Sequence, residues 1–126
     1  GFLGSCKFLY LATSETNCPS VRPVGFTAFF DNKLAVATSS KKGMSAQMKA
    51  NPEVELSATA ADVSAFARYR GRAKLCTDAE VVAKFVAAFP HFKEMYGDTL
   101  ELFLVEPEQA GIFPMKKGES PKTKNF

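Results

Sequence analysis

The chain has 126 residues, of which 46% are hydrophobic and 23% charged, a balance typical of a globular protein, and we expect residues 1–126 to form a single domain. The formal net charge of +3 is too small to predict binding to a nucleic acid, which usually requires a strongly basic surface. No apolar run approaches the roughly 18 residues of a membrane-spanning helix, so a membrane is not an expected partner either.

Alternating apolar residues and turn signals predict a mainly β protein with short helices. The predicted strands cover residues 7–13, 20–30, 33–38, 53–59, 64–76 and 100–113. Helices are predicted over residues 42–50 and 79–96, the second divided at Pro90. The end of the chain, residues 118–126, is expected to form a flexible tail or a short edge strand. Strands in this hairpin-like order predict an antiparallel β-barrel of six or seven strands.

A tight turn is predicted at Asp31-Asn32, where it would join the strands 20–30 and 33–38 in a hairpin. Counting outward from this turn, residues 22–24 would lie opposite residues 38–40. The two ends of the hairpin would then bring two polar motifs together.

The first motif is Arg22-Pro23, inside the predicted strand 20–30. One interpretation is an edge strand, in which proline loses no ladder hydrogen bond and Arg22 pairs with a surface carboxylate. The other is an arginine that binds the phosphate or carboxylate of a ligand.

The second motif is TSSKKG, residues 38–43, just before a predicted helix. Hydroxyl groups, two lysines and the free N–H groups of a helix N-terminus all attract a phosphate. The alternative is an ordinary helix cap with solvated lysines. The pattern lacks the frame of a P-loop.

A basic stripe alternates along the strand 64–76. Its members are Arg68, Arg70, Arg72 and Lys74. The favoured interpretation is a solvated face paired with Glu53 and Glu55 of the neighbouring strand. A groove for an acidic substrate is the alternative.

His91 is the only histidine, so neither a cluster of metal ligands nor a Ser-His-Asp triad is expected. The cysteines, Cys6, Cys18 and Cys76, are odd in number and lack a CxxC pair, which favours reduced thiols in a cytoplasmic protein. If the protein is an enzyme, a cofactor has to supply most of the chemistry.

The ordered set VRPVGF, TSSKKG, ANPEVE, RYRGRAKL and LELFLVEPEQAGIF resembles the FMN-binding split-barrel superfamily of pyridoxamine 5′-phosphate oxidase. The chain is most similar to its small bacterial members of the NimA/NimC kind. The resemblance implies a homodimer of split barrels with FMN at the subunit interface. The residues that it implies for FMN binding are Arg22, Pro23, Val24, Thr38, Ser39, Ser40, Lys41, Lys42 and Gln47.

In such proteins the arginine and the Ser/Lys loop hold the FMN phosphate, and the backbone around Pro23 and Val24 faces the flavin ring. True pyridoxamine 5′-phosphate oxidases end in a segment with an arginine and a histidine for the substrate phosphate, whereas this chain ends in KTKNF. We therefore expect an FMN-dependent oxidoreductase that uses a different small electron donor or acceptor, such as a nicotinamide, a nitro compound or a quinone. A non-enzymatic FMN-binding electron carrier and a haem-handling member of the superfamily are the alternatives.

Overall fold

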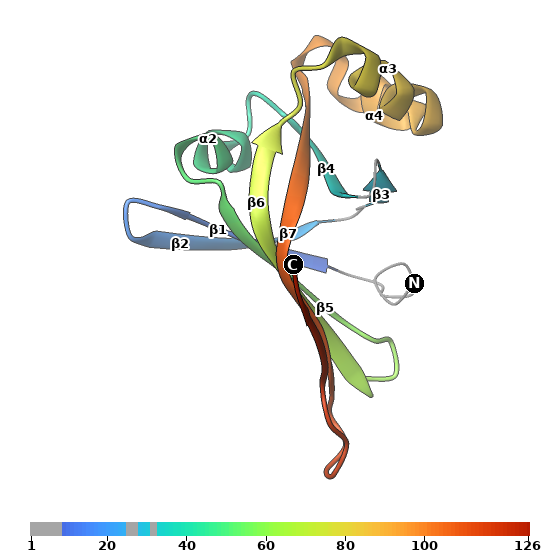
Figure 1. Cartoon of the computed structure of the whole chain (residues 1–126). Helices are drawn as coiled ribbons and strands as arrows, with labels where there is room; N and C mark the ends of the chain where they lie inside the picture. Colours follow the sequence, from blue (N-terminus) through green and yellow to red (C-terminus); the bar gives the residue numbers. More distant parts are fainter. Residues whose placement is uncertain (1–8, 25–27, 31–32) are drawn as a thin grey trace.

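The computed structural model describes residues 9–24, 28–30 and 33–126, and these form an antiparallel sheet with helices at one end (Figure 1). The strands are β1 (Leu9–Glu15), β2 (Cys18–Val24), β3 (Ala28–Phe30), β4 (Lys33–Ser39), β5 (Glu53–Thr59), β6 (Ala65–Leu75), β7 (Leu100–Pro114) and β8 (Lys122–Asn125). The helices are α2 (Gly43–Ala50), α3 (Ala79–Ala88), α4 (Pro90–Tyr96) and the 3₁₀ turn η1 (Gly97–Thr99).

The sheet follows the order β2-β1-β5-β6-β7-β4-β3, and β8 pairs with β7. Its two end strands, β2 and β3, are consecutive in the chain. Only residues 25–27 separate Val24 from Ala28, so their Cα atoms lie within about 14 Å of each other. The two ends of the path are therefore neighbours, and the sheet curls into a barrel that is open between them (Figure 1).

The predicted strand 20–30 is wrong as a single element. Its first part is β2, which forms a hairpin with β1 in the register Arg22↔Leu11. Thr16 and Asn17 close that hairpin with φ of 48° and 61°, and positive φ at both central positions suits the twist of a tight hairpin turn. The second part, β3, pairs with β4, and the predicted turn at residues 31–32 lies outside the described residues.

Residues 22–24 therefore do not lie opposite residues 38–40 in a common ladder. Thr38 faces Glu101 of β7 instead. This split, together with β8 in the tail, gives eight strands in the described residues, where six or seven were expected. The antiparallel barrel itself and the helical segments are confirmed.

The predicted helices match the structure closely. Helix α2 ends at Ala50, two residues before Pro52, as expected because proline cannot continue a helix. Asp78 caps α3, since its side chain accepts a hydrogen bond from the N–H of Glu80. None of the helices in the described part of the chain has the length and apolarity that crossing a bilayer requires.

Two apolar clusters stabilise the fold. The first fills the barrel with Leu9, Leu11, Leu34, Val36, Met48, Val54, Leu56, Phe103 and Val105 among its members. The second lies between the helix pair α3–α4 and the outer face of β4 and β7, where Phe85 stacks on Phe92 with 5.7 Å between ring centroids. This second cluster fixes α4 beside β4, at the helical end of the barrel (Figure 1).

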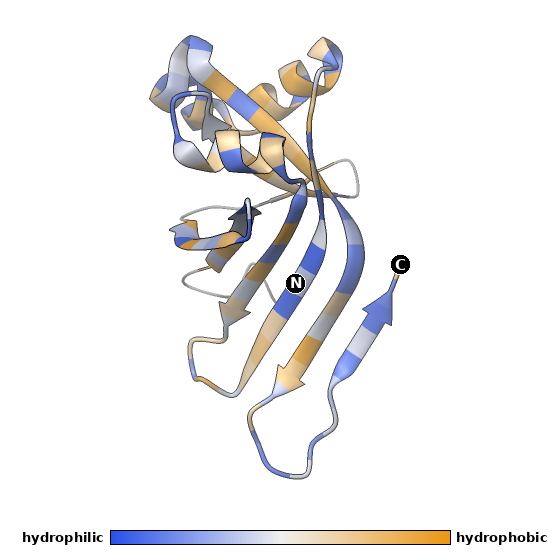
Figure 2. Ribbon diagram, turned by 90° about the vertical axis from the view of Figure 1, so that its left-hand side faces the viewer, coloured by the Kyte–Doolittle hydropathy of each residue, from blue (hydrophilic) through white to orange (hydrophobic). Residues whose placement is uncertain are grey.

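At the opposite end, β5, β6, β7 and β8 extend away from the helices (Figure 2). Apolar and polar residues alternate along β5 and β6, so one face of these two strands is mainly apolar and the other mainly polar (Figure 2). The polar positions of β6 include the basic stripe of the sequence.

Candidate anion-binding site

A cavity of about 280 Å³ lies where the barrel, α2 and α4 meet. It is lined by Arg22, Pro23, Val24, Ala37, Lys42, Met44 and Tyr96. These residues come from β2, β4, the start of α2 and the end of α4. Because β2 has β1 as its strand partner and otherwise forms the end of the sheet path, Pro23 costs the sheet little, and β2 can present the cavity with a strand edge.

The Arg22 guanidinium is held in place by uncharged side chains. Its Nη1 donates to Thr13 Oγ1 at 2.8 Å, and its Nη2 donates to Gln47 Oε1. Thr13 Oγ1 in turn donates to Gln47 Oε1 at 2.7 Å, and Gln47 Nε2 lies 3.4 Å from Ser20 Oγ. The three side chains therefore fix the plane of the guanidinium and leave its positive charge uncompensated.

Burial lowers the pKa of Arg22 somewhat, because the charged form loses water, but an arginine remains cationic at any physiological pH. Among the described residues, no carboxylate forms an ion pair with Arg22 or with Lys42. Strand β2 lies at one end of the sheet path, as the edge-strand interpretation predicted, but no carboxylate of the described residues pairs with Arg22. Two cations line one cavity without an anion from the described chain.

Lys42 occupies the N-cap position of α2 with extended backbone, φ −90° and ψ 145°. Its Nζ lies 3.5 Å from the hydroxyl of Tyr96 and 5.2 Å from the centroid of the tyrosine ring. No side chain in the described part of the structure caps α2, and no acidic residue lies in its first turn, so the first N–H groups of the helix add positive potential next to the lysine.

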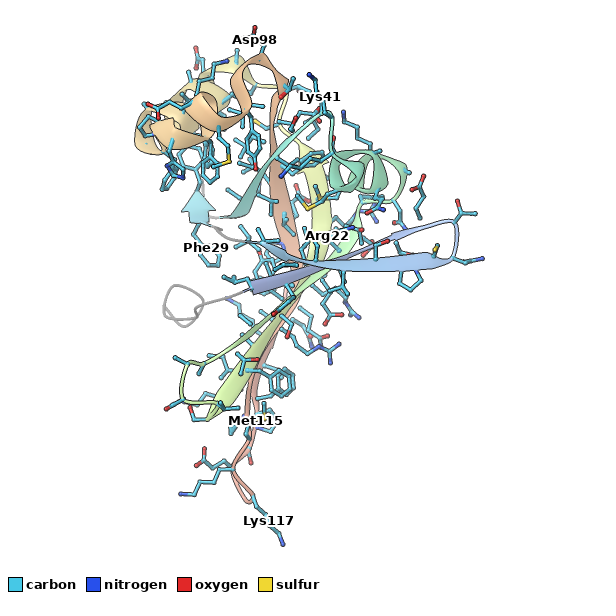
Figure 3. The ribbon with its side chains drawn as sticks, turned by 180° about the vertical axis from the view of Figure 1, so that it is seen from behind. Arg22, Phe29, Lys41, Asp98, Met115 and Lys117 are labelled. Atoms are coloured by element: carbon cyan, nitrogen blue, oxygen red, sulfur yellow. The ribbon has the colours of Figure 1, made fainter. Side chains whose placement is uncertain are left out.

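The remaining residues of the TSSKKG motif lie outside the cavity lining. Thr38 and Ser39 are buried, and Thr38 Oγ1 has no hydrogen-bond partner in the described structure. Ser39 Oγ accepts from the N–H of Lys41 at 3.2 Å and donates to Thr99 Oγ1 at 2.8 Å. Ser40 and Lys41 are exposed, and Figure 3 shows Lys41 in the loop after β4, apart from Arg22.

The predicted site residues therefore fall into three groups: residues that line the cavity, Gln47 beside Arg22, and the loop residues Thr38, Ser39, Ser40 and Lys41, which lie outside the lining. Arg22, Pro23, Val24 and Lys42 line one cavity, and closure of the barrel, not a shared hairpin, brings them together. Gln47 supports Arg22 from behind. Ala37, Met44 and Tyr96 also line the cavity and were not predicted from the sequence. No local pattern marks Tyr96, which lies 54 positions after Lys42 in the chain.

Three of the four members of the basic stripe of β6 form ion pairs, and two of them, Arg68 and Arg72, have the glutamate partners that the favoured interpretation predicted. Arg68 lies 2.6 Å from Glu55, and Arg72 lies 2.7 Å from Glu53. The hydrogen bond and the charge of Glu55 raise the pKa of Arg68. Lys74 pairs with Glu106 of β7 at 3.1 Å. These ion pairs make this face a weaker candidate for an anionic ligand than the cavity.

A family model described as pyridoxamine 5′-phosphate oxidase matches residues 1–113. The chain belongs to this family. The resemblance to the split-barrel superfamily is thereby confirmed, and the barrel is the fold of the pyridoxamine 5′-phosphate oxidase family. The curated proteins contain no match to the chain.

Several solved structures share the fold. A NimC/NimA family protein from Clostridium acetobutylicum is 28% identical and has a TM-score of 0.86 over 99% of this chain and 87% of that one. An FMN-binding protein related to pyridoxamine 5′-phosphate oxidase, from Nostoc punctiforme, is 15% identical with a TM-score of 0.67 over 95% and 87% of the two chains. A haem-binding protein from Mycobacterium smegmatis is 13% identical with a TM-score of 0.78 over 98% of this chain and 55% of that one.

Proteins with this fold thus carry more than one cofactor, so the choice for this chain has to be argued from its own cavity.

Proposed function

We propose that the chain binds FMN at this cavity, with the phosphate held between Arg22 and Lys42, and that it is an FMN-dependent oxidoreductase for a small electron donor or acceptor. The observation that carries this proposal is the pair of cations without a carboxylate partner in the described residues. A phosphate monoester supplies the missing negative charge and several acceptor oxygens.

The lining residues fit the rest of such a ligand as well. One side of the cavity is apolar and is formed by Val24, Ala37 and Met44. An apolar wall suits the ring system of a flavin, whereas a phosphate ion alone would not need it. Pro23 presents backbone without an N–H group on the strand edge, where the family resemblance places the ring. FMN supplies hydride or electron transfer when bound, and the chain's own residues bind and orient it.

A cavity of about 280 Å³ lies just below the range of roughly 300–1,000 Å³ that small-molecule sites usually occupy. We therefore propose that a second copy of the chain completes the site in a homodimer. Apolar side chains near the cavity strands favour this assembly: Val21 is 68% exposed, Phe29 60% and Tyr10 48%. Large exposed apolar groups on neighbouring strands are characteristic of protein interfaces. Figure 3 shows Phe29 beside the barrel opening.

The test is a titration of the purified protein with FMN and with riboflavin, followed by sedimentation with detection at the flavin absorbance. We expect FMN to bind, riboflavin to bind more weakly, and the flavin to sediment with a dimer. A protein that rejects FMN, or that binds FMN and riboflavin equally, contradicts the phosphate assignment. A Soret band in the purified protein would indicate haem instead.

Anaerobic mixing of the FMN-loaded protein with a reduced nicotinamide separates the enzyme from the carrier. Rapid bleaching of the flavin band followed by reoxidation with a quinone or a nitroaromatic compound supports an oxidoreductase. Bound FMN that no nicotinamide reduces would favour the electron-carrier alternative.

A further inference from the structure

We propose that the hydroxyl group of Tyr96 is a further ligand-binding group of this site, and that it donates a hydrogen bond to the same phosphate ester that Arg22 and Lys42 hold. The proposal rests on the proposed function, because the ligand is taken to carry a phosphate. Tyr96 belongs to α4, an element to which the sequence analysis assigned no part in binding.

The first argument is the contact between Tyr96 and Lys42. The lysine Nζ lies 3.5 Å from the tyrosine oxygen, and an ammonium group has donors but no acceptor. This contact therefore engages a lone pair of the tyrosine oxygen and leaves the O–H hydrogen free. Because Tyr96 lines the cavity, that hydrogen can be directed to a ligand held beside Lys42. The neighbouring positive charge makes the hydroxyl a better donor to an anion.

The second argument is the hydrogen-bond chain that fixes Tyr96 against the loop after β4. The N–H of Lys41 donates to Ser39 Oγ, and Ser39 Oγ donates to Thr99 Oγ1. Thr99 Oγ1 then donates to the carbonyl oxygen of Tyr96 at 2.7 Å. The N–H of Ser40 also donates to the carbonyl of Thr99, at 2.8 Å.

These bonds tie the end of α4 to the segment that carries Lys42. The aromatic ring of Tyr96 is also parallel to that of Phe92, with 6.4 Å between centroids and 9° between planes. The position of Tyr96 is thus determined from two sides. Ser39 and Thr99 use their hydroxyl groups on one another and on backbone, so we assign them as positioning residues and not as direct phosphate ligands.

The arrangement predicts selectivity for the phosphate. Arg22, Lys42 and Tyr96 approach the cavity from different elements, and a hydroxyl donor adds direction to the attraction of two cations. A flavin without a phosphate gains nothing from Tyr96. The ratio of the riboflavin Kd to the FMN Kd measures the contribution of the phosphate, so the change in this ratio when the hydroxyl is removed measures the part that Tyr96 supplies. A general loss of folding would change both constants together.

The direct test is Tyr96→Phe, which removes the hydroxyl and keeps the ring. We expect FMN affinity to fall about 10- to 150-fold, the range for a hydrogen bond to a charged group, while riboflavin affinity stays unchanged. The control is Ser64→Ala, which removes a hydroxyl that contacts Asp62 and does not line the cavity, and which should leave both constants unchanged. Equal FMN affinity in Tyr96→Phe and wild type overturns the proposal.

The positioning role has its own test in Thr99. Thr99→Val removes the hydroxyl at nearly constant volume and should lower FMN affinity without changing that of riboflavin. Thr99→Ser retains a hydroxyl and should restore the wild-type ratio. If the valine and serine variants both bind like wild type, Thr99 does not position Tyr96.

Inorganic phosphate separates a failure of this inference from a failure of the proposed function. Binding of inorganic phosphate is measured by its competition with FMN and by its effect on the melting temperature of the flavin-free protein. A wild type that binds FMN while only Lys42→Ala is weakened overturns the Tyr96 assignment alone. A wild type that phosphate stabilises but that does not bind FMN overturns the flavin proposal. In that case, loss of the stabilisation in Tyr96→Phe supports the phosphate contact of Tyr96, and unchanged stabilisation overturns it. A wild type that binds neither overturns both.

Discussion

Two strands of the same sheet carry arginines whose surroundings differ in one decisive respect. On β6, Arg68 and Arg72 each contact a glutamate of β5, at 2.6 and 2.7 Å. On β2, Arg22 contacts Thr13 and Gln47, which carry no charge. The first two guanidinium groups are neutralised by the protein, and the third is oriented by the protein while no carboxylate of the described residues pairs with it.

This difference indicates which arginines of a basic protein can bind an anionic ligand. An exposed ion pair cancels most of its own field and contributes about 0–1 kcal/mol to stability. Neutral partners fix the direction of a guanidinium and leave its charge for a ligand. The count of arginines would favour β6, whereas the identity of their partners favours β2.

Removing one arginine from each strand tests directly whether the two environments differ in their contribution to FMN binding. We expect Arg22→Ala to weaken FMN binding by about 1.5–3 kcal/mol, or roughly 10- to 150-fold, because a charge-assisted contact to the phosphate is lost. Arg72→Ala is the matched control and should leave the FMN Kd unchanged, since its charge is paired with Glu53. Fluorescence titration of both variants gives the measurement.

Equal losses in the two variants would mean that FMN responds to overall positive charge and not to this cavity. Thermal unfolding of Arg22→Ala has to accompany the titration, because Thr13 and Gln47 lose their shared partner in that variant. A variant that unfolds near the wild-type temperature and still binds FMN normally would exclude Arg22 from the phosphate site.

The parts of the fold that were predictable from sequence are those with local signals. Pro52 marks the end of α2 and Asp78 the start of α3, because both residues act on the helix next to them. The pairing of β6 with Glu53 and Glu55 was also predictable, since two adjacent alternating strands leave few registers.

The features that were missed depend on long-range closure of the barrel. A continuous run from residue 20 to residue 30 suggests one strand, but β2 and β3 occupy opposite ends of the sheet path. Tyr96 reaches Lys42 because an apolar cluster holds α4 on β4 and because hydrogen bonds through Thr99 join the end of α4 to the loop after β4. No periodicity or motif around residue 96 carries that information.

Two lysines at opposite ends of α2 show the same difference between unpaired and paired cations. Lys42 at the start of α2 has no carboxylate partner in the described structure, whereas Lys49 near its end contacts Glu101 at 2.6 Å. Glu101 also accepts a hydrogen bond from Ser45. Burial alone would raise the pKa of Glu101, but the bonds from Lys49 and Ser45 outweigh it and the pKa is lowered.

Because the pKa of Glu101 is lower in the folded state, its stabilisation is present above the pKa of the unfolded chain and is lost as the pH falls through the folded value. We expect Glu101→Gln to cost about 1 kcal/mol of unfolding free energy at neutral pH and almost nothing once wild-type Glu101 is protonated. Urea unfolding as a function of pH gives the measurement. A pH-independent difference between the two proteins would mean that packing, and not ionisation, is responsible.

The smallest effect is expected on the paired face of β6. Arg72→Ala and Glu53→Ala, combined in a double-mutant cycle, should give a coupling energy of about 0.2–1 kcal/mol, because both side chains are about half exposed and water screens the pair. Added salt should reduce this coupling further, since exposed charges are screened within about 10 Å at 0.1 M ionic strength. FMN affinity should not change in any corner of the cycle. A coupling well above this range would mean that water screens the pair less than its exposure suggests. A change in FMN binding would show that the paired face of β6 is energetically linked to the cavity, and the contrast between the two arginine environments would then no longer hold.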